Sequence, residues 1–137
     1  MAIFRRNLNG ADLRNADLSR GNFIRAVMRH ANLSNAVLRH ADLSKADLSN
    51  AILVSTNLDG AVMKDSDLSG ADLTGASFQN AILTNCDMRD ANVRGTTFKN
   101  AFLDSVKLKG AIYDRETLWP DGFNPEAAGA INSADND

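Results

Sequence analysis

The stretch ADLTGASFQNAIL at residues 71–83 decides the fold of this chain. Every fifth residue in it is large and apolar, namely Leu73, Phe78 and Leu83, and an alanine stands two positions before each of them. The same pattern runs in one frame from residue 6 to residue 115, which makes 22 consecutive five-residue units, or pentads. The large residue of each pentad, called position i, is never polar, and position i−2 is alanine in 15 pentads. Self-similarity at a fixed period indicates a solenoid.

A period of five fits neither an α-helix nor a flat strand. On an α-helix, residues five apart are rotated by about 140°, so the leucines would be spread around the whole cylinder. In a flat strand, an odd period places successive leucines on opposite faces. A chain that turns by a right angle after every pentad instead directs positions i and i−2 of all pentads to one axis. Residues twenty apart then stack on each other.

The residues at position i+2 support a turn at the end of each pentad. Twelve of these 22 residues are Gly or Asn, which tolerate the positive φ that a type II turn requires. Between residues 20 and 45 the sequence departs from this rule, and the corners are Arg20, Arg25, His30, Asn35, His40 and Lys45. We therefore expect mostly another turn type in that part of the chain.

Units such as ADLSR (16–20), ANLSN (31–35) and ADLSK (41–45) resemble the pentapeptide-repeat family. The resemblance covers about four-fifths of the chain. It implies an all-β fold, the right-handed quadrilateral β-helix, with four pentads in each coil and hence about 5.5 coils for 22 pentads. At about 4.8 Å per coil, the solenoid would form a rod of roughly 26 Å.

The domain organisation follows from where the repeat begins and ends. We predict a short N-terminal lead-in at 1–5, the β-helix at 6–115, a C-terminal cap at 116–131 and a disordered acidic tail at 132–137. A cap is expected because the end of a solenoid exposes apolar core and unpaired strand edges. We assign Trp119 and Phe123 as the residues of this structural cap, whereas the N-terminal end has no evident cap.

Charge and composition narrow the class of protein. The net charge of −2 is spread unevenly, with +4 on residues 1–50, −1 on 51–113 and −5 on 114–137. No apolar run is nearly as long as the stretch of about 20 residues that a membrane helix needs. The N-terminus also lacks the apolar stretch of a secretory signal. The sequence therefore predicts a cytoplasmic protein without membrane contact. Its single cysteine, Cys86, occupies an i−2 position, so we expect a small buried filler.

The polar residues do not form a convincing reactive site. They project from a convex rod, and a serine nucleophile needs a nearby base. His30 and His40 lie on opposite corners of one coil, where they cannot share a metal or a substrate atom. We therefore expect no enzymatic activity, no catalytic residue, no metal and no cofactor. Asp47, Asp67 and Asp87 stack in one outward column, which is either a cation site or acidic recognition stripe, or a set of local caps on backbone N–H groups.

Three apolar residues depart from the pattern most informatively. Val62, Ile82 and Phe102 stand at position i−1, where Asp or Asn is the rule, and fall on the same face of three consecutive coils. An exposed apolar ladder of this kind suggests an interface. Alternatively, the C-terminal segment folds back over the three residues, or apolar residues are simply tolerated there. Ile52 and Val54 form a weaker patch on the adjacent face.

These observations favour a non-enzymatic structural or protein-binding module with an unidentified protein partner. The resemblance implies one alternative, because some pentapeptide-repeat proteins protect or inhibit DNA gyrase by mimicking duplex DNA, usually as dimers. A DNA mimic should be acidic along its length, whereas this chain is basic at the front. Binding to nucleic acid is disfavoured because no surface aromatics interleave with the basic residues. The uneven distribution of charge, basic at the front and acidic at the end of the chain, permits a homodimer, but nothing in the sequence fixes its symmetry.

Overall fold

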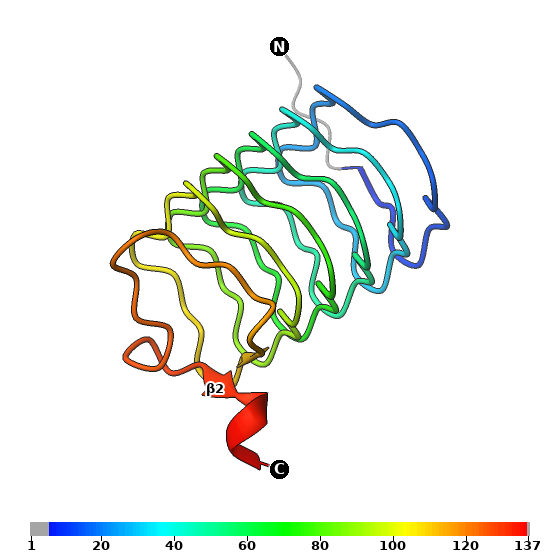
Figure 1. Cartoon of the computed structure of the whole chain (residues 1–137). Coiled ribbons are helices and arrows are strands. Elements are labelled where there is room, and N and C mark those ends of the chain that lie inside the picture. The colour runs from blue at the N-terminus through cyan, green and yellow to red at the C-terminus, as the bar shows by residue number, and fades with distance from the viewer. Residues whose placement is uncertain (1–5, 137) are drawn as a thin grey trace.

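The computed structural model describes residues 6–136 and shows a rod of stacked coils (Figure 1). Successive coils are joined by parallel backbone bridges between residues twenty apart, for example from Asn7 to Val27 and from Val27 to Asp47. Each coil therefore takes up four pentads. The coil that contains Arg6 and the C-terminal strand β2 lie at opposite ends of the rod. The predicted lead-in at 1–5 lies outside the described residues.

Regular strands are very short in this fold. Within residues 6–136 they are β1, Ile112–Tyr113, and β2, Ile131–Asn132, which pair in parallel and are followed by the 3-10 helix η1, Ser133–Asn136. Elsewhere each face contributes one bridging residue per coil, because a corner follows after only five residues. The ladders are thus columns of single bridges. The right-handed sense and the count of 5.5 coils stay predictions.

The corners of the rod all have the same backbone conformation. Every i+2 residue from Gly10 to Gly110 has a positive φ, and the turn is closed by a hydrogen bond such as that from the Ala46 N–H to the Leu43 carbonyl at 3.0 Å. Positive φ at the third residue is the signature of a type II turn. The expectation of another turn type between residues 20 and 45 is therefore wrong, since φ is 59–61° at Arg20, Arg25, His30, Asn35, His40 and Lys45.

Stacking between coils explains why these bulky corners adopt the same turn. The N–H of each i+2 residue from Gly10 to Asp90 donates to a carbonyl of the next coil, as the Lys45 N–H does to Lys64 at 2.9 Å. A different turn would point this N–H away from the ladder and leave it without a partner. The coils thus impose the turn even where the side chain is one that disfavours positive φ.

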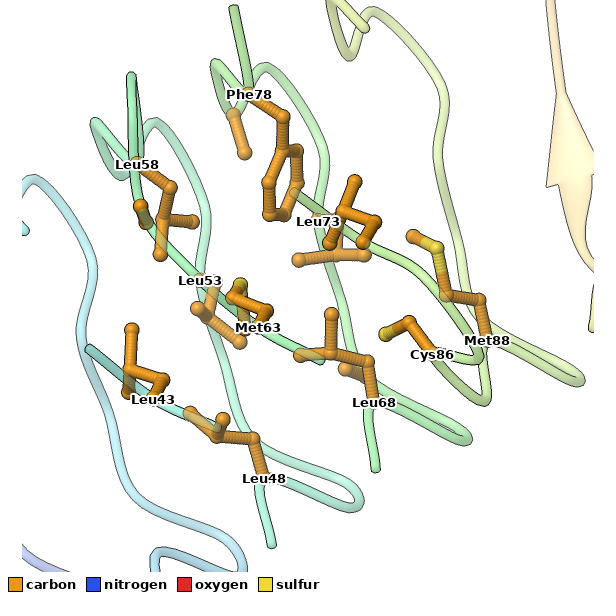
Figure 2. Close-up of a cluster of buried hydrophobic side chains, with 14 of the residues drawn as sticks. Leu43, Leu48, Leu53, Leu58, Met63, Leu68, Leu73, Phe78, Cys86 and Met88 are labelled. Atoms are coloured by element: carbon orange, nitrogen blue, oxygen red, sulfur yellow. The ribbon is translucent and has the colours of Figure 1, made fainter. Parts of the chain in front are cut away.

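The interior is filled by the i and i−2 side chains. Figure 2 shows the leucines and methionines of the central coils, together with Phe78 and Cys86, turned into the rod. Leu58 is completely buried, and burying a side chain of this size stabilises a fold by about 1.5–3 kcal/mol. Burial raises the pKa of Cys86 to about 12, so its thiol is an inert filler.

Aromatic rings close the C-terminal end. Phe78 and Phe98 stack at 5.3 Å between ring centroids, Phe98 and Trp119 at 4.9 Å, and Trp119 and Phe123 at 5.2 Å. Tyr113 meets Trp119 edge to face at 5.6 Å. The structure thus places Trp119 and Phe123 over the last coil, where they continue an interior column of rings beyond the repeat.

The two ends of the rod differ in how they are covered. In the first coil Leu8, Leu13 and Leu18 are only partly buried. At the other end, the Ile131 N–H donates to the Ala111 carbonyl at 2.7 Å, so β2 adds a rung to the last coil. Within the predicted tail, Asn132 pairs with the exposed edge of the last coil and η1 continues to residue 136. The disorder of the tail stays a prediction. Asp137 lies outside the described residues.

Candidate protein-binding face

One of the four faces carries the apolar residues that the sequence singles out. This face, called face D, presents Phe23, Leu43, Met63, Leu83 and Leu103 to the interior and five i−1 residues to the outside. Parallel bridges join the outward residues in the order Asn22, Asp42, Val62, Ile82 and Phe102. We call Val62, Ile82 and Phe102 the apolar ladder. It occupies the C-terminal part of face D.

A local hydrogen bond explains why Asp or Asn is the rule at position i−1. In twelve pentads the side-chain oxygen of an Asp or Asn at this position accepts a hydrogen bond from the backbone N–H two residues later. On face D, Asn22 caps the Ile24 N–H at 3.2 Å and Asp42 caps the Ser44 N–H at 3.0 Å. This is the Asx cap of turns, and it fixes the chain just before each corner.

The apolar ladder lacks this cap in three consecutive coils. Within residues 6–136, no protein acceptor is placed against the N–H groups of Lys64, Thr84 and Asp104. A hydrogen bond of this kind contributes about 0.5–1.5 kcal/mol. The ladder therefore forfeits three local bonds and presents an apolar surface instead.

The C-terminal segment does not cover the ladder at its exposed end. Phe102 is 57% exposed, the largest value among the large apolar residues that the structure describes, and Val62 and Ile82 are half-buried. The turn at 120–123 passes beside Phe102 and leaves a hollow of about 300 Å³ between them. Of the two alternatives that the sequence leaves open, intramolecular cover is therefore not realised at Phe102.

The acidic column on a neighbouring face makes local contacts. Asp47, Asp67 and Asp87 each cap a backbone N–H two residues later, at 2.8–3.1 Å. The Arg89 side chain pairs with Asp87 at 2.6 Å and holds the pKa of that carboxyl below its usual value. Burial raises the pKa of Asp47, but hydrogen bonds from Ser49 and Arg29 outweigh it and the pKa is lowered. Of the two interpretations that the sequence leaves open for this column, the structure therefore shows local caps on backbone N–H groups.

The remaining polar candidates stay apart from one another. His30 and His40 are exposed at separate corners, and no group of three or more His, Cys, Asp or Glu in the described part of the chain is placed to hold a metal ion. Arg14 pairs with Asp12 at 2.8 Å, and this hydrogen bond lowers the pKa of Asp12 to about 2. Among residues 6–136, no helix is long and apolar enough to cross a membrane.

Comparison with known proteins identifies the family. A family model for pentapeptide repeats matches in eight copies, over residues 7–44, 31–70, 41–80 and 71–110. The chain belongs to the pentapeptide-repeat family. It is similar to the crystal structure of a pentapeptide-repeat protein from the cyanobacterium Cyanothece 51142, with 34% identity, a TM-score of 0.81, and coverage of 83% of this chain and 91% of that one. A search of curated protein sequences gave no match.

Two further pentapeptide-repeat structures are less similar to this chain. A protein of the Arabidopsis thaliana thylakoid lumen is 28% identical, with a TM-score of 0.48 and coverage of 77% of this chain and 63% of that one. Trypsin-treated QnrB1, a plasmid-mediated fluoroquinolone resistance protein, is 16% identical, with a TM-score of 0.52 and coverage of 98% and 87%. At that identity, the likeness to QnrB1 shows the fold alone.

Sequence reasoning missed two features of this end of the rod. It did not expect the uncapped N–H groups beside the ladder, although the replacement of Asp or Asn at position i−1 is the signal for them. It also missed Leu118 and Ile131, which are 54% and 45% exposed. Both lie beyond the pentad frame, so no periodic position marks them as outward-facing.

Proposed function

We propose that this chain is a non-enzymatic protein-binding module, and that the apolar ladder is the surface that contacts its protein partner. The observation that carries the proposal is the coincidence of two properties in Val62, Ile82 and Phe102. They form a continuous outward column, and each takes the place of a residue that would cap the backbone. Aromatic and aliphatic side chains of this kind supply the central contacts of protein interfaces.

The regular coils support this role by keeping the ladder rigid. Each ladder residue is held by its own backbone N–H, which donates to the previous coil at 2.9 Å in all three cases. The carbonyls of Ile82 and Phe102 accept from the coil before at 2.7 and 2.9 Å. A surface that is already ordered loses little conformational entropy when a partner binds.

The test replaces the whole ladder without damaging the fold. In the ladder variant, Val62→Asn, Ile82→Asn and Phe102→Asn are combined, so each new side chain can cap the N–H two residues later, as Asn22 and Asn57 do. We expect an unchanged or higher melting temperature and the loss of the protein that the parent chain captures from its native cell extract, identified by mass spectrometry. Undiminished capture by a folded ladder variant would contradict the proposal.

The matched control makes the same chemical change on another face. Ile52 is also an apolar i−1 residue, 39% exposed. It lies on the opposite face and not on the adjacent one as expected, because it is ten residues, or two pentads, from Val62 in a coil of twenty. Ile52→Asn should gain a cap on the Val54 N–H and leave capture of the partner intact. This control separates loss of the ladder from a general effect of adding polar residues.

No feature of the described residues favours the alternative function, inhibition of DNA gyrase. The acidic side chains at i−1 are paired locally, and the front of the chain is basic. A supercoiling assay at micromolar protein decides the matter, since inhibition would place this chain among the DNA mimics. A cytoplasmic location and a homodimer stay predictions, for which cell fractionation and light scattering are the measurements.

A further inference from the structure

The hydrogen bonds between coils show which backbone groups each rung, the segment of one coil on a given face, presents to the next rung. On face D, the Ile82 N–H donates to the Ala61 carbonyl, the Met63 N–H to the Ile82 carbonyl and the Asp65 N–H to the Thr84 carbonyl, at 2.7–3.0 Å. Each rung thus presents one acceptor and two donors to the coil that follows. A rung that is not followed by another leaves these three groups open.

The last rung of face D is open in this way. Its corresponding groups are the Ala101 carbonyl and the N–H groups of Leu103 and Ser105, and none of them meets a protein partner within residues 6–136. Two of the other faces end differently. Ile131 pairs with the last rung of the opposite face, and the Leu118 N–H donates to the Thr96 carbonyl at 3.0 Å on a neighbouring face.

The C-terminal segment passes face D without pairing. After Leu118 the chain turns at 120–123, where the Phe123 N–H donates back to the Pro120 carbonyl at 3.1 Å. The Phe123 ring stacks on Trp119 and so serves the interior plug. The next pairing is on the following face, where the Gly110 N–H donates to Gly129 at 3.1 Å. The hollow of about 300 Å³ between this segment and face D is therefore left to another occupant.

We propose that an extended segment of the partner protein binds this hollow as an additional rung of face D. Its backbone would meet the Ala101 carbonyl and the Leu103 N–H, which is strand addition to an open sheet edge. Its outward side chain would continue the column of Val62, Ile82 and Phe102. This inference rests on the proposed function, and it adds the conformation and chemistry of the bound segment.

The residues around the hollow specify the composition of the segment. Phe102, Pro120 and Phe123 line it with apolar atoms, so the central side chain of the segment is apolar. Asp104 and Asp121 lie at its rim and are exposed. The C-terminal part of the chain carries a net charge of −5, so the flanks of the segment carry Lys or Arg. The partner segment is thus an extended apolar core between basic residues.

The experiment starts from a random-peptide display library selected against the full chain. We expect enrichment of peptides with an apolar centre and basic flanks, and loss of their binding, by tenfold or more in fluorescence anisotropy, with Phe102→Asn. Ile52→Asn should bind them like the parent. Synthetic versions with one N-methylated backbone amide at successive positions test the pairing directly. Methylation of the amide that meets Ala101 should weaken binding about tenfold, the effect of one hydrogen bond.

The outcomes separate this inference from the proposed function. Equal binding of every N-methylated peptide, or enrichment of acidic peptides, would overturn strand addition. The proposed function would still stand in that case if the ladder variant failed to capture the partner protein from the native cell extract. Absence of any enriched peptide would also overturn the inference. If light scattering shows that the parent chain self-associates and that Phe102→Asn abolishes this, the occupant is a second copy of the chain, and a separate partner is refuted.

Discussion

The corner at Lys45 allows the backbone rule of this fold to be tested by a single substitution. Lys45 has a φ of 59°, its side chain is exposed, and its N–H donates to Lys64 at 2.9 Å. Lys45→Gly keeps that hydrogen bond and removes the Cβ that makes a left-handed conformation unfavourable. We predict that this substitution stabilises the protein.

The magnitude follows from two opposing effects. A side chain in the left-handed region costs about 1–2 kcal/mol per residue. Glycine loses more conformational entropy on folding, which costs about 0.5–1 kcal/mol. The net gain for Lys45→Gly is therefore about 0.5–1 kcal/mol in the free energy of unfolding. With a slope of about 2 kcal/mol per molar urea, this corresponds to a rise of roughly 0.3–0.5 M in the denaturation midpoint.

Two further variants isolate the backbone contribution in the same urea titration. Lys45→Ala removes the charge and the long side chain but keeps the Cβ, so it should not reproduce the gain. Gly95→Ala makes the reverse change at a corner with φ of 66°, where the new Cβ would lie 3.6 Å from the Gly75 nitrogen, an ordinary contact. It should lower the free energy of unfolding by about 1 kcal/mol.

The reasoning would be refuted by equal stabilities of the glycine and alanine variants at Lys45. That result would mean that positive φ carries no penalty at this corner, and that the bulky corners between residues 20 and 45 need no help from the ladder. A harmless Gly95→Ala would point to the same conclusion. Either result would rule out stacking between coils as the cause of the uniform turns.

Three other predictions concern stability. Leu58→Asp places a charge in the centre of the rod, where Leu58 is fully buried, and should abolish cooperative melting in circular dichroism; a soluble variant with a cooperative transition would contradict the tube packing. Trp119→Ala removes the middle of the ring stack and should lower the free energy of unfolding, measured in urea, by about 3–5 kcal/mol. Trp119→Phe should lower it much less, because it keeps the stacking and removes an indole N–H that is buried without a partner in the described structure. Equal losses of stability in the two variants would count against stacking. The pKa of Asp87 is lower in the fold than its usual 3.8, so the stability it contributes is complete above about pH 4 and is lost as the pH falls through the lower value. Asp87→Asn should therefore weaken the loss of stability at acid pH when the free energy of unfolding in urea is measured at a series of pH values. An unaltered pH dependence would refute the role of this carboxylate.

The positions that fill the core could be predicted because one period fixes them all. Once residues twenty apart stack, the burial of Leu58, Phe78 and Cys86 follows from their place in the frame, and the structure has them buried. The family could be identified from the same frame, and the comparisons show it. Local and long-range preferences agree at these positions, which makes a sequence easy to interpret.

The features that the sequence did not predict depend on contacts outside a single pentad. At Arg25 and Lys45 the residue type argued against a positive φ, but the hydrogen bond to the next coil overrides that local preference. Ile131 pairs with Ile112, which is 19 residues away and not 20, so the frame could not place it. The hollow beside Phe102 arises where the chain leaves the frame at the turn after Leu118.

The strongest reason to assign the apolar ladder a role outside the fold is a comparison within the same coils. Asp47, Asp67 and Asp87 occupy position i−1 on one face of the rod, and each caps a backbone N–H. Val62, Ile82 and Phe102 follow these three residues by fifteen positions and lie on the neighbouring face D. Their backbone setting and parallel bridges are the same, but the cap is absent. Folding alone favours Asp or Asn equally at both sets of positions, because the turn and the bridge are the same. This difference repeats in three successive coils and supports the proposed role of face D, which the ladder variant and its Ile52→Asn control are designed to test.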